Sequence, residues 1–318
     1  MSSKSNNKGR AYEFSYLITL FEEIYKVRKV KIEENSSYFS AEKSWNTLNE
    51  SEKILYKLSA LAGVKTIFEL EPLILDDGDD ELELKIQSDD KGKEGDVRDV
   101  LIIRRGIEWE IGLSIKHNHF AVKHSRISKN LDFGRKWYRV DCSKQYWEEV
   151  KPIFEYLEFE KKKGTKWRDL YNKEDTVYIP LLNAFKDELK RQSNLFGKDI
   201  PKLMVEYLLG KFDFYKVIGI DSKRITQIQS YNLRGTLNKQ GKKYKRSIEL
   251  PKPLLPTRIV SLEYKPGSKN TLELYLDGGW QFNFRIHNAS TKVETSLKFD
   301  IQIIGMPTTI ISLDCRWD

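Results

Sequence analysis

Residues 94–128 read EGDVRDVLIIRRGIEWEIGLSIKHNHFAVKHSRIS, and they contain two mainly aliphatic runs, VLII and IEWEIGLSI, separated by a turn at RG. Two such runs on either side of a Gly-containing turn are typical of a β-hairpin. The midpoint between positions 99 and 114 falls at this turn. A hairpin that folds here therefore places Asp99 opposite or nearly opposite Ser114, with Lys116 one step further on the same face.

This pairing brings together two groups with complementary chemistry. Opposed side chains of a hairpin lie about 5 Å apart, close enough to serve one metal ion and its water molecule. A carboxylate such as Asp99 can hold a divalent cation, and an ammonium such as Lys116 can polarise water or neutralise charge. The sequence therefore predicts metal-assisted cleavage of a phosphodiester, in which the carbonyl oxygen of Ile115 could be a further ligand of the divalent cation.

Composition limits the class of protein. The chain has 318 residues, long enough for one elaborated domain or two, and its 55 Lys and Arg against 47 Asp and Glu give a charge of +8. A basic balance favours polyanionic partners such as double-stranded DNA. Only Cys142 and Cys315 are present, too few for a disulfide framework or a cysteine-based zinc site. The polar residues 1–10 lack the apolar core of a secretory signal, so we expect a cytoplasmic protein.

The chain reads as an α/β protein with two parts. Apolar residues recur at helical spacing in residues 10–27 and through most of 143–210. From residue 214 onward, strand-like runs alternate with turn residues. We expect a nuclease core with helical insertions over residues 1–210, built on a mixed sheet flanked by helices. A β-rich part over residues 211–318 is expected to bind and recognise DNA.

Two shorter motifs indicate local structure rather than chemistry. Asn49 can cap a helix while Glu52 reaches back to it, and this helix is expected to end near Gly63. The acidic run at 76–80, DDGDD, lacks the spaced ligands and the distal Glu of a calcium loop. We expect it to be a solvated turn.

The hairpin resembles the centre of the PD-(D/E)xK nuclease superfamily. In that superfamily an Asp at the start of one strand and an acid-x-Lys motif on the next bind magnesium and position the attacking water. Asp99 fits the first acid and Lys116 fits the lysine, whereas Ser114 stands where the second acid is expected. Some restriction enzymes of that superfamily have this Ser-x-Lys variant, with the missing carboxylate supplied by another element.

The missing second acid has two candidates. Glu110 shares the correct face but lies about 13 Å along the strand from Ser114, too far to hold the same ion. Glu13 lies inside the apolar arc of the first helix, where a carboxylate needs a partner. Residues 9–13, GRAYE, stand at the start of this helix and resemble the G-x-x-x-E at the first helix of related resolvases and nucleases. A structural ion pair is the alternative role for Glu13. Asp96 is the second candidate, because the loop at Gly95 could bend it inward.

The likeness extends to a particular family. GDVRDVLIIRR, GLSIKHNHFAVKHSRIS and WQFNFRIHNASTKVETSLKFDIQIIG resemble the HaeIII-type family of type II restriction endonucleases, and the likeness covers most of the chain. It predicts that the chain is the enzyme that gives this family its name. It also implies Mg²⁺-dependent double-strand cleavage of the palindrome GGCC with blunt ends, and a companion DNA methyltransferase that protects host DNA. A palindromic target suits a homodimer, although a monomer could also act on it.

Three regions are expected to contact DNA. The residues after Lys116 do not fit an HNH nuclease or a zinc site, because adjacent strand residues point to opposite faces and no fourth ligand is evident. Phosphate contacts are more plausible there and in the basic run 238–246, for which a charged solvated turn is the alternative. In residues 280–288, alternating polar side chains could meet base edges. The expected DNA contacts are His117, Asn118, His119, Lys123, Arg126, Lys242, Lys243, Arg246, Arg285, His287 and Asn288.

Two other classes of protein remain as alternatives. Ser114 could mark a degenerate site in a DNA-binding protein without catalysis, or the fold could serve a structure-selective resolvase. Digestion of plasmid in magnesium or in EDTA discriminates between the first alternative and an endonuclease. Discrete fragments from a linear duplex would argue against a resolvase.

Overall fold

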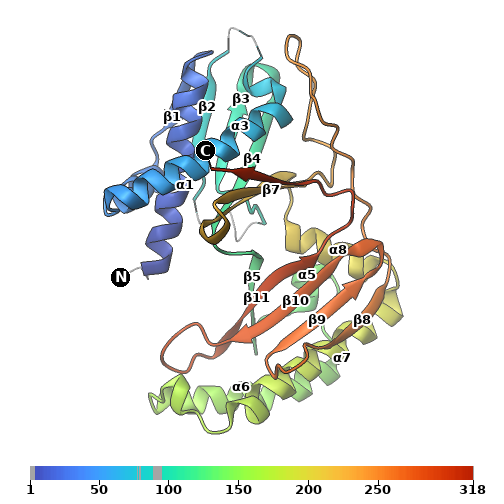
Figure 1. The fold of residues 1–318 in the computed structure, drawn as a ribbon. Coiled ribbons are helices and arrows are strands. Elements are labelled where there is room, and N and C mark those ends of the chain that lie inside the picture. Colours follow the sequence, from blue (N-terminus) through green and yellow to red (C-terminus); the bar gives the residue numbers. More distant parts are fainter. Residues whose placement is uncertain (1–3, 77, 79, 89–94, 318) are drawn as a thin grey trace. The chain divides into compact units, whose positions relative to one another are not determined.

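The structure is a computed structural model that describes residues 4–76, 78, 80–88 and 95–317. The chain forms two compact units, each assembled from separated segments. Unit 1 comprises Met1–Phe120, Gly210–Pro253 and Thr308–Asp318, and unit 2 comprises Ala121–Leu209 and Leu254–Pro307. Figure 1 shows both units coloured along the sequence.

A seven-stranded mixed sheet forms the centre of unit 1, in the order β1-β2-β3-β4-β6-β7-β12. The pairs β1/β2 and β4/β6 are parallel, and the other neighbouring pairs are antiparallel. The strands are β1 (Val30–Glu33), β2 (Leu82–Ile86), β3 (Val100–Arg104), β4 (Trp109–His117), β6 (Phe214–Ile220), β7 (Ile225–Tyr231) and β12 (Ser312–Arg316).

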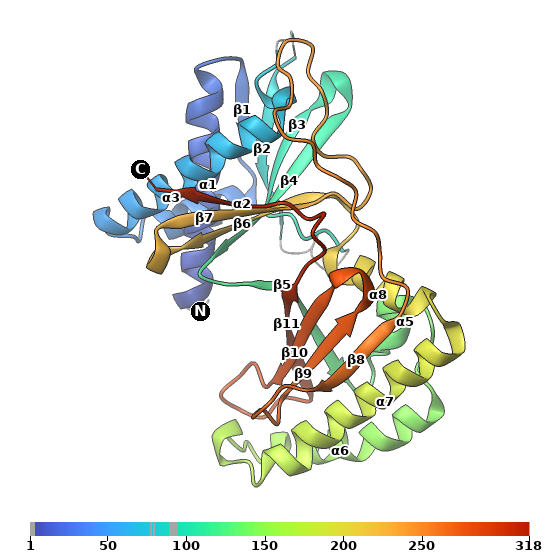
Figure 2. The same cartoon turned by 45° about the vertical axis from the view of Figure 1, so that its right-hand side comes forward.

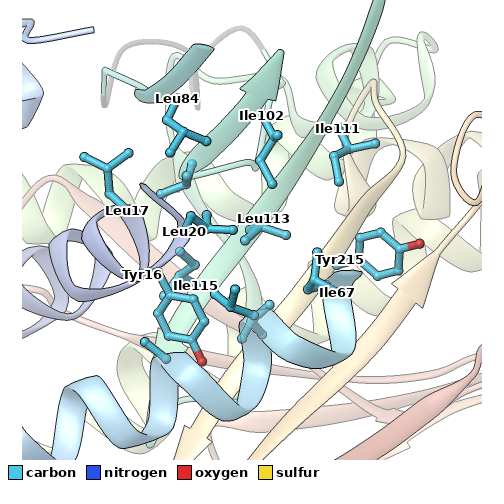
Figure 3. Packing of buried hydrophobic residues seen from close by; sticks show 14 of the residues in the cluster. Tyr16, Leu17, Leu20, Ile67, Leu84, Ile102, Ile111, Leu113, Ile115 and Tyr215 are labelled. Carbon is cyan, nitrogen blue, oxygen red and sulfur yellow. The ribbon is translucent and has the colours of Figure 1, made fainter. Parts of the chain in front are cut away.

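Three helices pack on one face of this sheet, α1 (Lys4–Tyr25), α2 (Ser36–Trp45) and α3 (Glu50–Leu70), as Figure 2 shows. Leu17 and Leu20 of α1 and Ile67 of α3 meet Leu113 and other residues of the central strands in one hydrophobic core (Figure 3). This face uses every second residue of β4, so the alternate residues, Ser114 and Lys116 among them, belong to the opposite face. Short helical turns complete the unit: η1 (Pro72–Ile74), η2 (Arg105–Ile107) and η5 (Asp221–Lys223).

Unit 2 is built on a five-stranded antiparallel sheet in the order β5-β11-β10-β9-β8. Its apolar face packs on helices, and Phe284 and Phe299 form aromatic contacts with Trp137 and Phe185 there. The strands are β5 (Ala121–Ser128), β8 (Ile259–Tyr264), β9 (Thr271–Leu276), β10 (Gln281–His287) and β11 (Ser296–Gly305). The helical elements are α5 (Phe133–Tyr138), α6 (Lys144–Lys162), η3 (Trp167–Asp169), η4 (Glu174–Tyr178), α7 (Ile179–Phe196), α8 (Asp199–Leu209) and η6 (Asp277–Gly279).

The α/β class, the mixed sheet and a separate β-rich sheet confirm the predicted fold class. The division along the chain differs from the expected boundary at 210. Residues 121–209 lie in unit 2 rather than in the core, and residues 211–253 lie in unit 1. The reason is strand pairing: β6 joins β4 in parallel, and β5 joins β11. A parallel pair needs a long crossover, and the segment between β4 and β6 supplies it.

The predicted start of α3 is confirmed, because Asn49 and Glu52 form a capping box. The predicted end at Gly63 is wrong, since α3 continues to Leu70. Gly63 instead allows close packing: a Cβ there would lie 2.8 Å from the hydroxyl of Tyr16. Among the described residues, helices with the length and apolar character of a membrane span are absent.

Candidate active site

Asp99 and Lys116 meet where β3 and β4 begin to separate. Val100 pairs with Leu113, which places Asp99 opposite Ser114 and confirms the predicted register. Oδ2 of Asp99 accepts hydrogen bonds from Lys116 Nζ at 2.8 Å and from the backbone N–H of Ile115 at 2.6 Å. The carboxylate thus accepts from the N–H of Ile115, which would otherwise form the next backbone hydrogen bond between β3 and β4. This bond fixes the carboxylate beside the ammonium.

The remaining geometry leaves one side of this carboxylate open. Ser114 Oγ lies 3.4 Å from the same Oδ2, so all three donors approach one oxygen. Within the described part of the chain, Oδ1 of Asp99 accepts no hydrogen bond, and the side chain is 23% exposed. A carboxylate oxygen with open lone pairs fits Mg²⁺, which prefers hard oxygen ligands.

Lys116 stands between two negative charges. Burial acts to lower its pKa, but the charge and hydrogen bond of Asp99, together with the charge of Glu13, raise it overall. Glu13 is half-buried on α1 and lies within electrostatic reach of Lys116. The raised pKa keeps Lys116 a cation, which suits neutralising charge rather than removing a proton.

Asp96, the second candidate for the missing acid, is already part of an ion pair. Its Oδ1 accepts from the backbone N–H and Nε of Arg98, and its Oδ2 accepts from Nη2 of Arg98 and from Gln87. Arg98 also bonds Glu110 at 2.9 Å. Both carboxylate oxygens of Asp96 thus have structural partners, which continues to favour Glu13 as the second carboxylate.

Lys216 of β6 is a residue that the sequence reasoning missed. It pairs with Ser114 across the parallel β4/β6 ladder, so it shares the face of Ser114 and Lys116. Its Nζ donates to the carbonyl of Phe120 at 2.6 Å, and only 2% of the residue is exposed. Burial, with a smaller effect from Lys116, lowers the pKa of Lys216 to about 7. A lysine inside the otherwise apolar run FYKVIGI was the signal for it.

His117 points to the opposite face from Lys116, as strand alternation requires. Its ring lies beside Tyr12 and Tyr56, and Nε2 is 2.8 Å from Asp221. Asn118 also bonds Asp221, both through its amide and through its carbonyl oxygen. These contacts of His117 and Asn118 join the ends of β4 and β6, whereas the neighbouring His119 is exposed.

Two expected contacts on β5 separate onto different faces of the sheet of unit 2. Lys123 lies on the helix side, where its Nζ donates to the carbonyl of Tyr207 at 2.8 Å. Arg126 lies on the other side, with its side chain 43% exposed and paired with Glu294 at 3.1 Å. Arg126 is therefore the more accessible candidate for DNA contact, whereas Lys123 is held on the helix side.

The basic run 238–246 is anchored through its backbone by a carboxylate of the acidic run. Asp76 is 3% exposed and accepts from the backbone N–H groups of Lys242, Lys243 and Tyr244. These bonds lower the pKa of Asp76, although burial alone would raise it. The lysine side chains of 242 and 243 are exposed, so the loop presents cations while a buried acid holds its shape.

The expected solvated turn at 76–80 is therefore wrong for its described residues. Besides Asp76, Asp80 is paired with Arg28 at 2.9 Å and with Arg104 at 2.6 Å. Positions 77 and 79 lie outside the described residues. Asp76 and Asp80 therefore connect segments that are distant in the sequence, through backbone N–H groups and arginines respectively.

Glu71 anchors the start of the same basic run. It accepts from the hydroxyl of Tyr215 at 2.6 Å and from the backbone N–H of Asn238 at 2.5 Å. Glu71 is fully buried, and Oε2 has no hydrogen-bond partner among the described residues. Burial raises its pKa to about 7, although the two hydrogen bonds act in the opposite direction. Arg246, at the end of the run, bonds the carbonyl of Asn238 and Glu249.

In unit 2, Arg285 and His287 lie on the face of the sheet opposite the helices, because the alternate residues Phe284 and Ile286 are fully buried. This packing confirms the predicted alternation. Asn288 differs, since its amide donates to the carbonyls of Ser290 and Lys292 and its oxygen accepts from Glu294. The hydrogen bonds of Asn288 therefore shape the turn that follows β10.

A carboxylate and a lysine fixed at the end of a central hairpin of a mixed sheet are what a metal-dependent nuclease requires. Comparison with known families agrees: the chain belongs to the family described as HaeIII restriction endonuclease, which matches residues 9–307. It is 56% identical over 318 residues, covering 100% of both chains, to the Type II restriction enzyme HaeIII of Haemophilus aegyptius. Comparison with solved structures found no match.

The chain is therefore a type II restriction endonuclease. At 56% identity it is a homologue of the enzyme from Haemophilus aegyptius, so the prediction that it is the name-giving enzyme itself is wrong. Family membership also favours an endonuclease over the non-catalytic DNA-binding protein and the resolvase. A restriction enzyme acts on DNA, in agreement with the predicted partner.

Proposed function

We propose that this enzyme cleaves both strands of duplex DNA at GGCC, leaves blunt ends and requires Mg²⁺. The observation that carries the proposal is the pairing of Asp99 with Lys116, in which Oδ2 is fixed by the ammonium and a backbone N–H while Oδ1 accepts no hydrogen bond from the described residues. The target sequence rests on the resemblance to the HaeIII family, since no residue pattern specifies it.

Asp99 and Glu13 would hold Mg²⁺, and the carbonyl oxygen of Ile115 could complete the protein's share of its ligands. When bound, the ion supplies Lewis-acid stabilisation of a phosphate oxygen and lowers the pKa of a bound water molecule. Lys116, kept protonated by its acidic neighbours, donates to a non-bridging phosphate oxygen and neutralises the charge that develops there. Ser114 helps to fix Asp99.

Exposed cations in both units suit the phosphate backbone. In unit 1 these are Lys242 and Lys243 of the anchored loop, with Arg246 and His119 as further candidates. In unit 2 they are Arg126 and Arg285, with the half-buried His287 as a further candidate contact. Such contacts supply most of the salt-dependent affinity for DNA.

The test is digestion of a plasmid of known sequence by the purified full chain, in Mg²⁺ and in EDTA, followed by sequencing of the ends. We expect flush ends within every GGCC in Mg²⁺ and intact plasmid in EDTA. Fragments that end at another sequence would refute the proposed specificity and retain the nuclease. Intact plasmid in Mg²⁺ would refute the catalytic assignment.

A palindromic target also leads us to propose a two-fold homodimer on DNA and a companion methyltransferase. Sedimentation of the enzyme with a short GGCC duplex in EDTA tests the dimer, and one chain per duplex would contradict it. Plasmid methylated within GGCC should resist digestion if methylation protects the host. Equal digestion of methylated and unmethylated plasmid would contradict this protection.

A further inference from the structure

The face of the five-stranded sheet opposite the helices carries two rows of polar side chains, which we call the polar face. The first row is Arg285, Asp300 and His124, and the second is His287, Lys298 and Arg126, on β10, β11 and β5 in turn. Directly opposed residues of an antiparallel pair point the same way, so each row lies on one side of the sheet. The two rows are two residues apart along every strand, which puts them on the same face.

Arg285 is held on this face by a buried carboxylate. Nη2 of Arg285 lies 3.3 Å from Oδ2 of Asp300, and the arginine side chain is 54% exposed while that of Asp300 is 7% exposed. Oδ1 of Asp300 is buried without a hydrogen-bond partner among the described residues, and Nδ1 of His124 lies 3.5 Å from it. One guanidinium nitrogen of Arg285 is therefore held by Asp300, and more than half of the side chain remains exposed to solvent.

The second row adds positive charge beside Arg285. Burial, and then the charges of Arg126 and Arg285, lower the pKa of Lys298, while the charge of Asp300 opposes them. Arg126 is 43% exposed and also bonds the backbone and hydroxyl oxygens of Ser296. The rows thus hold three Lys or Arg side chains and two histidines, with Asp300 as the carboxylate within them and Glu294 beside Arg126 at 3.1 Å. This balance complements a polyanion, and among polyanions the enzyme's substrate is duplex DNA.

We propose that Arg285 reads a guanine of the target site in the major groove and that Asp300 is the positioning residue that orients its guanidinium. The inference rests on the proposed function and names a residue that sets its specificity. Two guanidinium nitrogens match O6 and N7 of guanine, which is the commonest specific contact in protein–DNA complexes. Asp300 is too buried to meet a base itself, but it can restrict the rotation of Arg285. Arg126 and Lys298, one row away, contact phosphates.

The test is a double-mutant cycle between Arg285 and atom N7 of guanine. Duplexes carry the cleavage site found by digestion, with one guanine at a time replaced by 7-deazaguanine, and binding is measured in EDTA. We expect the wild type to lose about 5- to 50-fold affinity at one guanine. Arg285→Ala should bind the natural duplex more weakly and show no further loss at that guanine, because its partner is already gone.

Three variants sharpen the result. Asp300→Asn keeps the volume and should reduce the 7-deaza effect at that guanine to a fraction of the wild-type factor. Arg126→Ala is the matched control on the same face: it should weaken binding to every duplex alike, lower the salt slope by about one and leave the 7-deaza factor unchanged. Lys151→Ala, on α6 with 70% side-chain exposure, should change neither quantity.

The inference is overturned if Arg285→Ala retains the full 7-deaza factor at every guanine, since the arginine then contacts only the backbone. An unchanged factor in Asp300→Asn would refute the positioning role. Thermal melting of each variant separates these outcomes from misfolding. If digestion reveals a site other than GGCC, the proposed sequence fails while the guanines of the true site still test Arg285. A site without guanine would refute both.

Discussion

The sheets of the two units differ in how far their charged side chains are paired with one another or exposed to solvent. In the seven-stranded sheet, the charges at the ends of β3 and β4 bind one another: Lys116 to Asp99, and Arg98 to Asp96. In the five-stranded sheet, Arg285 and Arg126 remain more than two-fifths exposed even where they have acidic partners. Chemistry at a phosphate needs groups fixed to within a fraction of an ångström, whereas contact with a long polyanion needs accessible cations.

The difference follows from where each charge stands along its strand. Asp99 precedes β3, so its side chain can replace a backbone acceptor and take the N–H of Ile115. Arg285 lies in the middle of β10, where both neighbours complete the ladder and its side chain can only point away from the sheet. Strand ends therefore fix side chains through unused backbone groups, and strand centres present them to solvent.

The largest effect is expected where the fixed pair is broken. Asp99→Asn or Lys116→Ala should reduce the rate of plasmid cleavage by about 10³-fold or more, because each removes a charge from the reacting phosphate or its metal. Binding of a GGCC duplex in EDTA should change much less. Asp314→Asn, a carboxylate on β12 of the same sheet, should cleave at the wild-type rate. Near-normal cleavage by Asp99→Asn would contradict the assigned centre.

Substitutions of the two candidate acids, Asp96 and Glu13, should affect different properties: stability for Asp96 and cleavage for Glu13. Asp96→Asn breaks a buried ion pair with Arg98 and should lower the free energy of unfolding by about 3 kcal/mol in urea. Glu13→Gln should leave stability nearly unchanged, reduce cleavage and raise the Mg²⁺ concentration needed for half-maximal rate. If Glu13→Gln unfolds at a lower urea concentration than the wild type but cleaves DNA at the wild-type rate when the folded concentrations are equal, Glu13 is a structural residue.

The anchoring of the basic loop should appear as a pH dependence of stability. The pKa of Glu71 is about 7 in the folded protein, above its usual value, so the folded state favours the protonated form. Its contribution to stability is full below the ordinary pKa of 4.5 and is lost as the pH rises from there through about 7, by at most about 3 kcal/mol. Glu71→Gln should flatten this part of the curve in urea titrations from pH 4.5 to 8. An equal slope in both proteins would contradict the assignment.

The smallest effect is expected from the exposed loop cations. Replacing both Lys242 and Lys243 by Gln should weaken DNA binding several-fold at physiological salt and lower the slope of log affinity against log salt by up to about two. The backbone bonds to Asp76 do not use these side chains, so thermal stability should not change. An unchanged slope would assign the loop to solvent rather than to DNA.

Local spacing was enough to predict the hairpin, because the register depends only on distances from one turn. It also indicated Glu13, since a carboxylate inside an apolar arc needs a partner. The neighbourhood of Lys216 could not be predicted: β6 reaches β4 after a crossover of 96 residues, and nothing in either strand marks the partner. Strand alternation alone already indicated that His117 faces away from Lys116.

The acidic run at 76–80 shows a second limit of prediction from the sequence. A cluster of carboxylates looks solvated when its partners are not adjacent in sequence, and those of Asp80 are Arg28 and Arg104. Asp76 reaches still further, to backbone groups of residues 242–244. The order of charges along the sequence therefore does not show which acids are buried by distant partners.

The order of segments along the chain has a consequence for synthesis of the enzyme. The polypeptide passes between the units after residues 120, 209, 253 and 307, so β12 is added to the sheet of unit 1 only after all of unit 2 has been made. Until then the edge of β7 lacks its neighbour. A ribosome-bound chain would thus carry the hairpin of β3 and β4 in a sheet that still lacks its last strand.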